Sequence, residues 1–237
     1  PLLAEQNYPD FEIIFVDDAS SDTTLDIFEE FEKKYTNVRL VKVENNEAFW
    51  GNKKFALTLG IKAATKDYLL FTDADCYPTS KDWITLMSSQ FTMHKTFVLG
   101  YGAYEKIRGS FLNKIIRFET MLSAVQYFSW AKVGHPYMGI GRNLAYKKDE
   151  FFKVNGFIDH MKIRSGDDDL FINQASKGNN TTCCYSPDSF TYSKPNMTFK
   201  DWIAQKKRHV ATATFYKSFD RIQLSVFFIS QILFLIL

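Results

Sequence analysis

Short apolar runs that end in acidic residues alternate with amphipathic stretches over the first hundred residues. The run at 11–16 is rich in β-forming residues and ends at Asp17 and Asp18, which predicts a buried strand with acids at its carboxyl end. Apolar residues then recur every three to four positions over 25–35, behind a Ser-Ser-Asp triplet that offers an N-cap. A helix is expected there, followed by a second strand at 38–43.

The same alternation continues to about residue 101. A helix is predicted at 53–64, and the strand predicted at 68–72 again runs directly into acids, Asp73 and Asp75. A helix near 81–91 and a strand near 97–101 follow. Alternation of this kind predicts an α/β fold with a mostly parallel sheet, helices on both faces, and ligands bound beyond the carboxyl ends of the strands.

The second half of the chain is less regular. A long helix is predicted at 110–130, a strand at 139–146, and a helix at 168–177 that ends at a glycine. Residues 200–217 mix aromatic and basic side chains, a pattern compatible with lying along a membrane surface.

Both ends of the chain are interpreted as incomplete elements. Residues 1–8 read as the tail of a helix and its exit loop, and residues 222–237 form an apolar run shorter than the ~20 residues that span a bilayer. We interpret this run as a truncated transmembrane helix. A buried terminal helix is the alternative, because the run contains Gln223 and Gln231.

Composition limits the classes of partner. With 46% hydrophobic residues the chain can bury a core, and 29 basic against 27 acidic residues provide no broad positive field for nucleic acid. The three cysteines, two of them adjacent, lack the spacing of a disulfide framework or a zinc site. A reducing, cytosolic environment fits this usage.

Asp73 and Asp75 are the first candidates for chemistry. In an extended backbone, residues two apart point to the same side, ~6.6 Å apart at Cα. Two such carboxylates can hold a cation such as Mg²⁺ together with the phosphate oxygens of a substrate. Alone the pattern is common in loops, but its position after a buried strand favours a site.

Asp17 and Asp18 are open to two interpretations. They either contact the base or ribose of a nucleotide or simply cap the following helix. Lys53 and Lys54 likewise either reach a phosphate from a helix start or form a solvated basic pair.

The third acidic cluster is Asp167, Asp168 and Asp169, after a glycine and at the start of a predicted helix. The helix dipole there stabilises an ionised carboxylate, as a general base requires. Capping alone is the alternative, although three acids exceed what a cap needs. Arg208, three residues after Gln205, is a candidate clamp for a diphosphate.

Taken in order, these motifs are F-E-I-I-F-V-D-D-A-S-S-D-T-T, F-T-D-A-D, G-D-D-D-L and Q-K-K-R-H. The ordered set resembles glycosyltransferase family 2, the inverting enzymes of GT-A fold that include cellulose, chitin and hyaluronan synthases and many bacterial polysaccharide and lipid glycosyltransferases. The resemblance covers residues 8–208. Each motif alone is unspecific, whereas their order is strong evidence.

The resemblance implies a role for each matching residue. Asp17 and Asp18 would bind the base and ribose, Asp73 the ribose or the metal, and Asp75 the cation. The family usually has Glu-Asp where this chain has Asp167 and Asp168, so Asp168 is expected as the general base, with Asp169 as the alternative. Membrane synthases carry Q-x-x-R-W, which places Gln205 and Arg208 at the donor diphosphate and His209 in the tryptophan position. The family's first strand, which would precede Gln6, is not found in the sequence.

These inferences predict a metal-dependent transfer of sugar from a nucleotide donor, UDP-sugar first, to a glycan or lipid hydroxyl with inversion. The required cofactor is Mg²⁺ or Mn²⁺. The alternatives are a Mg²⁺-binding phosphoacceptor signalling domain and an inactive membrane-bound scaffold. We expect a catalytic domain at 1–198, an interfacial segment at 199–221 and a membrane helix at 222–237. Basic residues before the apolar run place the catalytic domain on the cytoplasmic side of the cell membrane.

Overall fold

The first strand, helix and strand form as predicted. The structure is a computed structural model that describes residues 1–44, 53–163 and 165–236. Strands β1 (Ile13–Asp17) and β2 (Val38–Lys42) pair in parallel, and α1 (Thr24–Lys34) connects them. The apolar face of α1 packs on β1, where the rings of Phe15 and Phe28 stack with centroids 4.5 Å apart. The N-cap is Thr23, without a side-chain cap hydrogen bond, so the predicted Ser-Ser-Asp cap is displaced by one residue.

The next predicted elements are present but mostly shorter. They are α2 (Lys53–Ala63), β3 (Tyr68–Phe71), α3 (Trp83–Ser88) and β5 (Phe97–Leu99). Two further strands, β4 (Cys76–Pro78) and β6 (Gly102–Tyr104), were not predicted. The strand predicted at 97–101 ends at Leu99, and β6 begins beyond the predicted range, at Gly102. At Gly100 the backbone comes so close to Asn143 that a Cβ would lie 2.4 Å from its side chain. The chain changes sheets at this glycine.

The sheets are mixed, which corrects the predicted mostly parallel sheet. Strands β3, β7 (Leu144–Lys147), β5 and β8 (Thr181–Cys183) form one sheet in that order, and β7 runs antiparallel to both of its neighbours. A second sheet has the order β4, β9 (Thr191–Ser193), β6. Hydrophobic periodicity reports which faces of a strand are buried and carries no information on its direction.

Residues 1–8 form turns rather than the predicted tail of a helix. The strand predicted at 139–146 starts only at Leu144, after a 3₁₀ turn, η1 (Gly141–Asn143). The remaining short elements of this half are α5 (Lys148–Lys153), η2 (Ile158–His160), α6 (Asp169–Ala175) and η3 (Pro187–Ser189).

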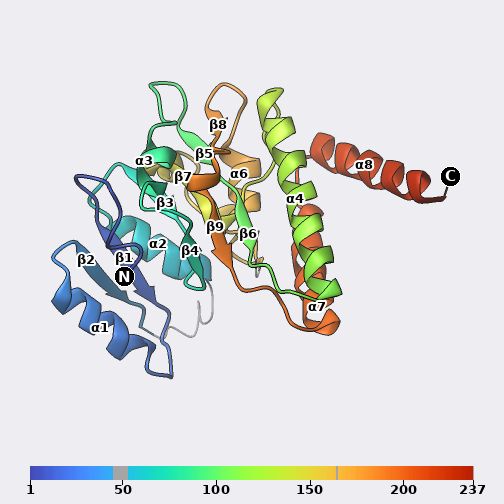
Figure 1. The fold of residues 1–237 in the computed structure, drawn as a ribbon. Helices are drawn as coiled ribbons and strands as arrows, with labels where there is room; N and C mark the ends of the chain where they lie inside the picture. The colour runs from blue at the N-terminus through green and yellow to red at the C-terminus, as the bar shows by residue number, and fades with distance from the viewer. Residues whose placement is uncertain (45–52, 164, 237) are drawn as a thin grey trace.

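Helices α4 (Phe111–Lys132) and α7 (Phe199–Ala213) lie along one side of the molecule, and α8 (Ser218–Ile236) projects away from it (Figure 1). Helix α4 starts at Ser110, whose side chain accepts a hydrogen bond from the Asn113 amide. Helix α7 lies beside α4, held by an ion pair between Lys206 and Glu119. Among the described helices, none combines the length and the apolar character that crossing a membrane requires.

Aromatic side chains form the core between the four-stranded sheet and α6. Phe171 of α6 is fully buried, with its ring centroid 4.7 Å from that of Tyr146 and 6.0 Å from that of Phe97. Phe151 and Phe157 pack on the same ring. Burial of one such side chain contributes about 1.5–3 kcal/mol. This packing fixes α6, and with it the acidic segment that precedes the helix.

Candidate active site

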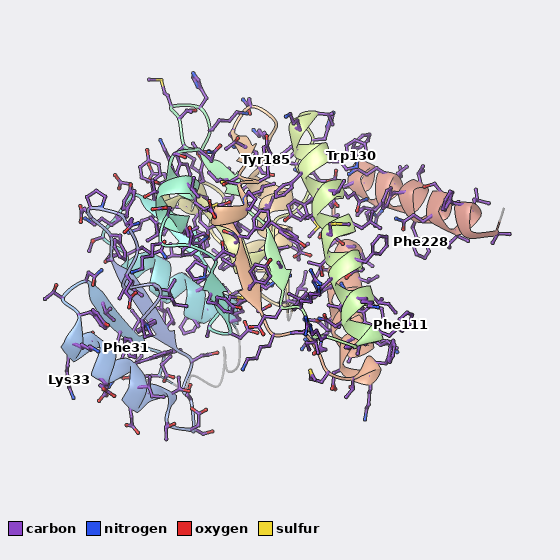
Figure 2. All side chains as sticks on the ribbon, in the orientation of Figure 1. Phe31, Lys33, Phe111, Trp130, Tyr185 and Phe228 are labelled. Atoms are coloured by element: carbon purple, nitrogen blue, oxygen red, sulfur yellow. The ribbon has the colours of Figure 1, made fainter. Side chains whose placement is uncertain are left out.

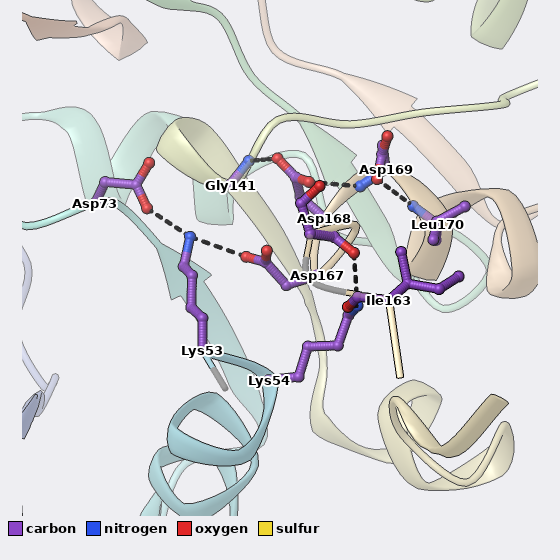
Figure 3. Close-up of polar contacts among 10 residues, drawn as sticks. Lys53, Lys54, Asp73, Gly141, Ile163, Asp167, Asp168, Asp169 and Leu170 are labelled. Atoms are coloured by element: carbon purple, nitrogen blue, oxygen red, sulfur yellow. Dashed lines mark hydrogen bonds and ion pairs between the residues drawn. The ribbon is translucent and has the colours of Figure 1, made fainter. Parts of the chain in front are cut away.

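Lys53 joins two acidic clusters that are far apart in the sequence. It is the first residue of α2, and its Nζ lies 3.0 Å from Asp73 Oδ1 and 2.9 Å from Asp167 Oδ2 (Figure 3). Burial by itself would lower the pKa of Lys53, but the carboxylates of Asp167, Asp73 and Asp168 outweigh burial and raise this pKa well above its ordinary value. Half of the side chain is still accessible to solvent. Lys53 is therefore a fixed positive charge in an open site.

The predicted pair Asp73 and Asp75 lies on a tight turn after β3. The Cys76 amide donates to the Asp73 carbonyl over 3.0 Å, which closes the turn. Ligand atoms of Asp73, Asp75 and Cys76 all lie within 4.8 Å of one another. Three donor atoms at these separations can contact a single cation, because metal–ligand distances are about 2.0–2.6 Å. The residues present thus fit a divalent cation.

Asp168 is held by the backbone of two separate segments. Its Oδ2 accepts a hydrogen bond from the Gly141 amide over 2.6 Å, and its Oδ1 accepts one from the Asp169 amide over 2.8 Å (Figure 3). Burial, together with the nearby charges of Asp167 and Asp169, raises the pKa of Asp168 to about 7, although Lys53 and the Gly141 amide act in the opposite direction. A carboxyl group with this pKa can both take up and release a proton near neutral pH.

Asp169 has a different environment. It is 8% exposed, and its Oδ2 accepts hydrogen bonds from the hydroxyls of Thr212 and Tyr216, the latter over 2.7 Å. Its Oδ1 accepts from the Leu170 amide over 2.7 Å. These bonds connect the start of α6 to the C-terminal helices, so the carboxylate is engaged in holding the fold.

Lys54 is buried, which excludes the solvated basic pair considered from the sequence. Its side chain is 1% exposed, and Nζ donates to the carbonyls of His160, Ile163 and Ser165 at 2.9, 2.7 and 2.6 Å. Burial lowers the pKa of Lys54, while the charges of the three aspartates after Ser165 raise it. The ammonium group holds the backbone of the segment that leads to Asp167.

Asp17 and Asp18 point to different environments. Asp17 is 4% exposed and its Oδ2 accepts from the Ser20 amide over 3.4 Å, whereas Asp18 is exposed. Among the described residues, Asp17 Oδ1 has no hydrogen-bond partner. Ala19 has φ of +55°, a left-handed conformation that is strained for a residue with a Cβ. This backbone conformation of Ala19 turns the chain sharply at the end of β1.

One cavity of about 710 Å³ is bordered by most of the predicted site residues. One part is apolar and lies between β1, α2, β3 and α3. The other part is polar and is bordered by Asp18, Lys53, Asp73, Cys76, Gly141, Asp167 and Asp168. Acids from three distant parts of the sequence therefore meet in one cleft. Asp75 is exposed beside Asp73 and Cys76 at this end.

Gln205 and Arg208 on α7 do not border the cavity. The side-chain oxygen of Gln205 accepts from the Asn196 amide group over 2.8 Å, and its amide group donates to the Tyr104 hydroxyl over 3.4 Å. Arg208 is exposed. Arg142 connects this part of α7 with the cavity. It follows Gly141 in η1, and its guanidinium lies 4.3 Å from the centroid of the Tyr104 ring, whose hydroxyl accepts from Gln205.

Several residues of the site were not predicted from the sequence. Gly141 and Arg142 lie in η1, within a segment that was predicted to be a strand. Cys76 follows the acidic pair directly, so its position was an available signal. The role of Lys54 depends on contacts across more than a hundred residues and had no local signal.

Comparison with known proteins is consistent with this geometry. The family model described as "Glycosyl transferase family 2" matches residues 2–165. The chain is 26% identical over 206 residues to a poly(ribitol-phosphate) beta-glucosyltransferase of Bacillus spizizenii, covering 80% of this chain and 32% of that protein. It is 28% identical over 204 residues to the probable glycosyltransferase YdaM of Bacillus subtilis, covering 83% and 46%. The chain thus spans less than half the length of these relatives.

Solved structures show the same fold. The mannosyltransferase PcManGT from Pyrobaculum calidifontis, in complex with GDP-Man and Mn²⁺, superposes with a TM-score of 0.67 at 19% identity, covering 92% of this chain and 59% of that one. TarS 1–349 of S. aureus, in complex with UDP-GlcNAc, gives a TM-score of 0.56 at 20% identity, covering 83% and 53%. The common architecture is an α/β fold of GT-A type.

Proposed function

The chain belongs to glycosyltransferase family 2 and is an enzyme of the glycosyltransferase class, and from this premise we propose that it transfers a sugar from a nucleotide donor in a single, inverting displacement. The observation that carries the proposal is the convergence of Asp18, Lys53, Asp73, Asp167 and Asp168 on one cavity. A phosphoacceptor domain would have no use for the fixed Asp168 opposite Asp73.

Asp168 is the proposed general base. Its two backbone hydrogen bonds hold the carboxyl group at the cavity, and its raised pKa allows it to accept the proton of an acceptor hydroxyl at neutral pH. Asp169 is the less suitable candidate, because both of its oxygens are engaged by Thr212, Tyr216 and Leu170. Its role is to position the neighbouring base.

Asp73 and Asp75 are the proposed ligands of a divalent cation, Mg²⁺ or Mn²⁺. Such a cation would neutralise the negative charge of the departing diphosphate. Lys53 adds a second positive charge at the same end of the cavity, 3.0 Å from Asp73. The Mn²⁺ in the structure of PcManGT supports the assignment.

Asp17 and Asp18 are proposed to form the nucleotide end of the site, with Asp18 facing the ligand and the buried Asp17 supporting the turn at Ala19. A UDP-sugar is the first expected donor, and the UDP-GlcNAc and GDP-Man complexes of the structural neighbours support a nucleotide sugar. The diphosphate role of Gln205 and Arg208 rests on the Q-x-x-R motif alone, because neither residue borders the cavity in this structure. The acceptor is a hydroxyl of a glycan or lipid.

The C-terminal helices are proposed to attach the enzyme to the cytoplasmic face of the cell membrane. Figure 2 shows Phe111 on α4 and Phe228 on α8 projecting outward, and they are 69% and 62% exposed. A group of large, exposed apolar side chains on neighbouring helices is typical of an interaction surface. In this proposal residues 1–198 form the catalytic domain, 199–221 lie at the interface and 222–237 enter the membrane.

A screen of nucleotide sugars tests the function. The protein is incubated with UDP-, GDP- and dTDP-sugars, with Mn²⁺, with Mg²⁺ or with EDTA, and both thermal stability and release of nucleoside diphosphate are measured. We expect one nucleotide class to stabilise the protein and to be hydrolysed only with the cation. Failure of every donor to bind under all conditions would refute sugar transfer by this cavity.

A further inference from the structure

Tyr216 lies at the corner between α7 and α8 and reaches the acidic segment before α6. Its hydroxyl donates a hydrogen bond to Asp169 Oδ2 over 2.7 Å. The side chain is 7% exposed, and the centroid of its ring lies 6.1 Å from that of Tyr137. The ring is therefore held in the core, and the hydroxyl is directed at the acidic segment.

Asp169 connects this hydroxyl to Asp168. The carboxylate of Asp169 accepts the bond from Tyr216, and the backbone amide of the same residue donates to Asp168 Oδ1 over 2.8 Å (Figure 3). The other oxygen of Asp168 accepts from the Gly141 amide over 2.6 Å. Loss of either amide contact would let the carboxyl group of Asp168 rotate about its side-chain bonds. The position of Asp169 thus determines one of the two contacts that orient Asp168 at the cavity.

The buried carboxylate of Asp169 receives its side-chain donors from the C-terminal helices. Thr212 and Tyr216 both donate to Oδ2. A hydroxyl has one proton, and the Thr212 oxygen also lies 2.7 Å from the His209 carbonyl, so Thr212 can satisfy only one of its two acceptors at a time. Burial and the charge of Asp169 raise the pKa of Tyr216 well above its ordinary value, so this hydroxyl keeps its proton at neutral pH. Tyr216 is the donor with the better-defined partner.

Further hydrogen bonds hold the corner against α6. Asn173 lies one helical turn after Asp169, accepts from the Lys217 amide over 3.1 Å and donates to Asp220 over 2.8 Å. Asn173 and Asp220 are 4% and 6% exposed, so these bonds are shielded from water. They fix the backbone directly after Tyr216, and the hydroxyl is thereby held at Asp169.

We propose that Tyr216 is a positioning residue of the transfer reaction, which holds the general base Asp168 at the cavity through Asp169. The inference rests on the proposed function and on the role of Asp168 in it. Tyr216 does not border the cavity, so its effect on the reaction is transmitted by hydrogen bonds. In this arrangement the C-terminal helices contribute to catalysis as well as to the fold.

Tyr216→Phe is the principal test, because it removes the hydroxyl and keeps the ring. We expect kcat to fall about 10- to 100-fold, since a misplacement of about 1 Å at a reacting group can cost a factor of about 10². The donor KM should stay within about twofold, because the base acts only as the new bond forms. Both are measured from release of the nucleoside diphosphate, with UDP-GlcNAc and Mn²⁺ first and otherwise with the nucleotide sugar that the screen identifies. Rates are divided by the concentration of donor-binding protein from calorimetry, which removes the effect of unfolded molecules.

Tyr127→Phe is the matched control. Tyr127 of α4 is 1% exposed, and its hydroxyl donates to the Gly100 carbonyl over the same distance, 2.7 Å. Each variant loses one buried tyrosine hydrogen bond, so both melting temperatures should fall by a similar amount. Only Tyr216→Phe should lose kcat. Thr212→Val removes the other donor to Asp169 and is the second variant if Tyr216→Phe does not fold, with a fall in kcat at unchanged donor KM expected again.

A double-mutant cycle shows whether Tyr216 acts through the base. In the Asp168→Asn background, Tyr216→Phe should change the residual rate less than about twofold, because the group that it positions is already absent. An undiminished fall in that background, the parent kcat in Tyr216→Phe, or an equal fall in Tyr127→Phe would overturn the positioning role. The proposed function fails by other measurements. A parent protein that turns over no donor would refute both, whereas a slow Asp168→Asn beside an unaffected Tyr216→Phe would refute the positioning role alone.

Discussion

At the scale of single residues, three consecutive aspartates have three different surroundings. Asp167 pairs with Lys53, Asp168 accepts two backbone hydrogen bonds at the cavity, and Asp169 is tied to the C-terminal helices. Neighbours in sequence differ in their contacts because each side chain leaves the turn in another direction. Asp168 combines access to the cavity with a pKa raised to about 7 by burial and by its charged neighbours.

Replacing Asp168 by Asn should lower the rate of transfer by about 10²–10⁴-fold and leave donor binding nearly intact, because the base acts only as the new bond forms. The measurements are single-turnover transfer and donor affinity by calorimetry. Asp26→Asn, which removes an exposed carboxylate on α1, is the matched control. Transfer by Asp168→Asn at the parent rate would disprove the role.

The pH dependence follows from the raised pKa of Asp168, about 7. A base must be deprotonated, so kcat/KM should rise with pH, reach a plateau above about 7, and fall tenfold per pH unit well below it. The effect on stability has the opposite sign. Since the pKa in the folded protein is raised, stability from this group is complete below its unfolded pKa of about 4 and is lost as pH rises through about 7. Asp168→Asn should therefore stabilise the protein more at pH 8 than at pH 5, as thermal denaturation at both pH values can show.

At the scale of elements, the first turn of α2 supports the acidic segment before α6 in two ways. The ammonium group of Lys53 forms an ion pair with Asp167 of this segment. The ammonium group of Lys54 donates hydrogen bonds to the backbone carbonyls that precede Asp167. Successive residues at a helix start point in different directions, so one lysine reaches the cavity and the next is buried. A shift of the α2 register by one residue would therefore exchange the exposed and the buried position of the two lysines.

The two lysines should therefore respond differently to substitution. Lys54→Met leaves three carbonyl groups without their donor, and the loss of hydrogen bonds to a buried charge costs about 1.5–3 kcal/mol or more. For a chain of this size, we expect the melting temperature to fall by about 4–10 °C. Lys53→Met, on a half-exposed side chain, should leave the melting temperature nearly unchanged and weaken donor binding. Equal loss of stability in both variants would contradict this division of roles.

At the scale of the whole molecule, the cavity and the C-terminal helices lie on different parts of the fold. The β1–α1–β2 unit is at one end and α8 is at the other (Figure 1). Hydrogen bonds connect the two regions, since Asn173 of α6 donates to Asp220 of α8 over 2.8 Å and accepts from the Lys217 amide over 3.1 Å. An enzyme attached through α8 would be held at the end of the molecule opposite the β1–α1–β2 unit.

Vesicle binding tests the proposed attachment. Phe228→Asp places a charge on the exposed face of α8, and binding to vesicles of anionic lipid should fall roughly 10- to 100-fold, from the cost of inserting Asp into an apolar layer. Ile27→Asp on α1 is a matched control, because that side chain is 48% exposed and lies on a helix at the other end of the molecule. Sedimentation measures both. Equal binding of the two variants would remove α8 from the interface.

The sequence by itself determined the α/β class, the strands that end in acids, the family and the acidic segments that the structure brings to one cavity. These features are local, because hydrophobic periodicity and short motifs are written in neighbouring positions. Tertiary structure alone decided that β7 runs antiparallel, that Lys54 is buried while Lys53 is not, and that Asp168 and Asp169 have separate hydrogen-bond partners. Each of these depends on contacts between residues tens of positions apart, such as Gly141 with Asp168 and Thr212 with Asp169. Burial and pKa values follow from those contacts, so no local pattern could have predicted them.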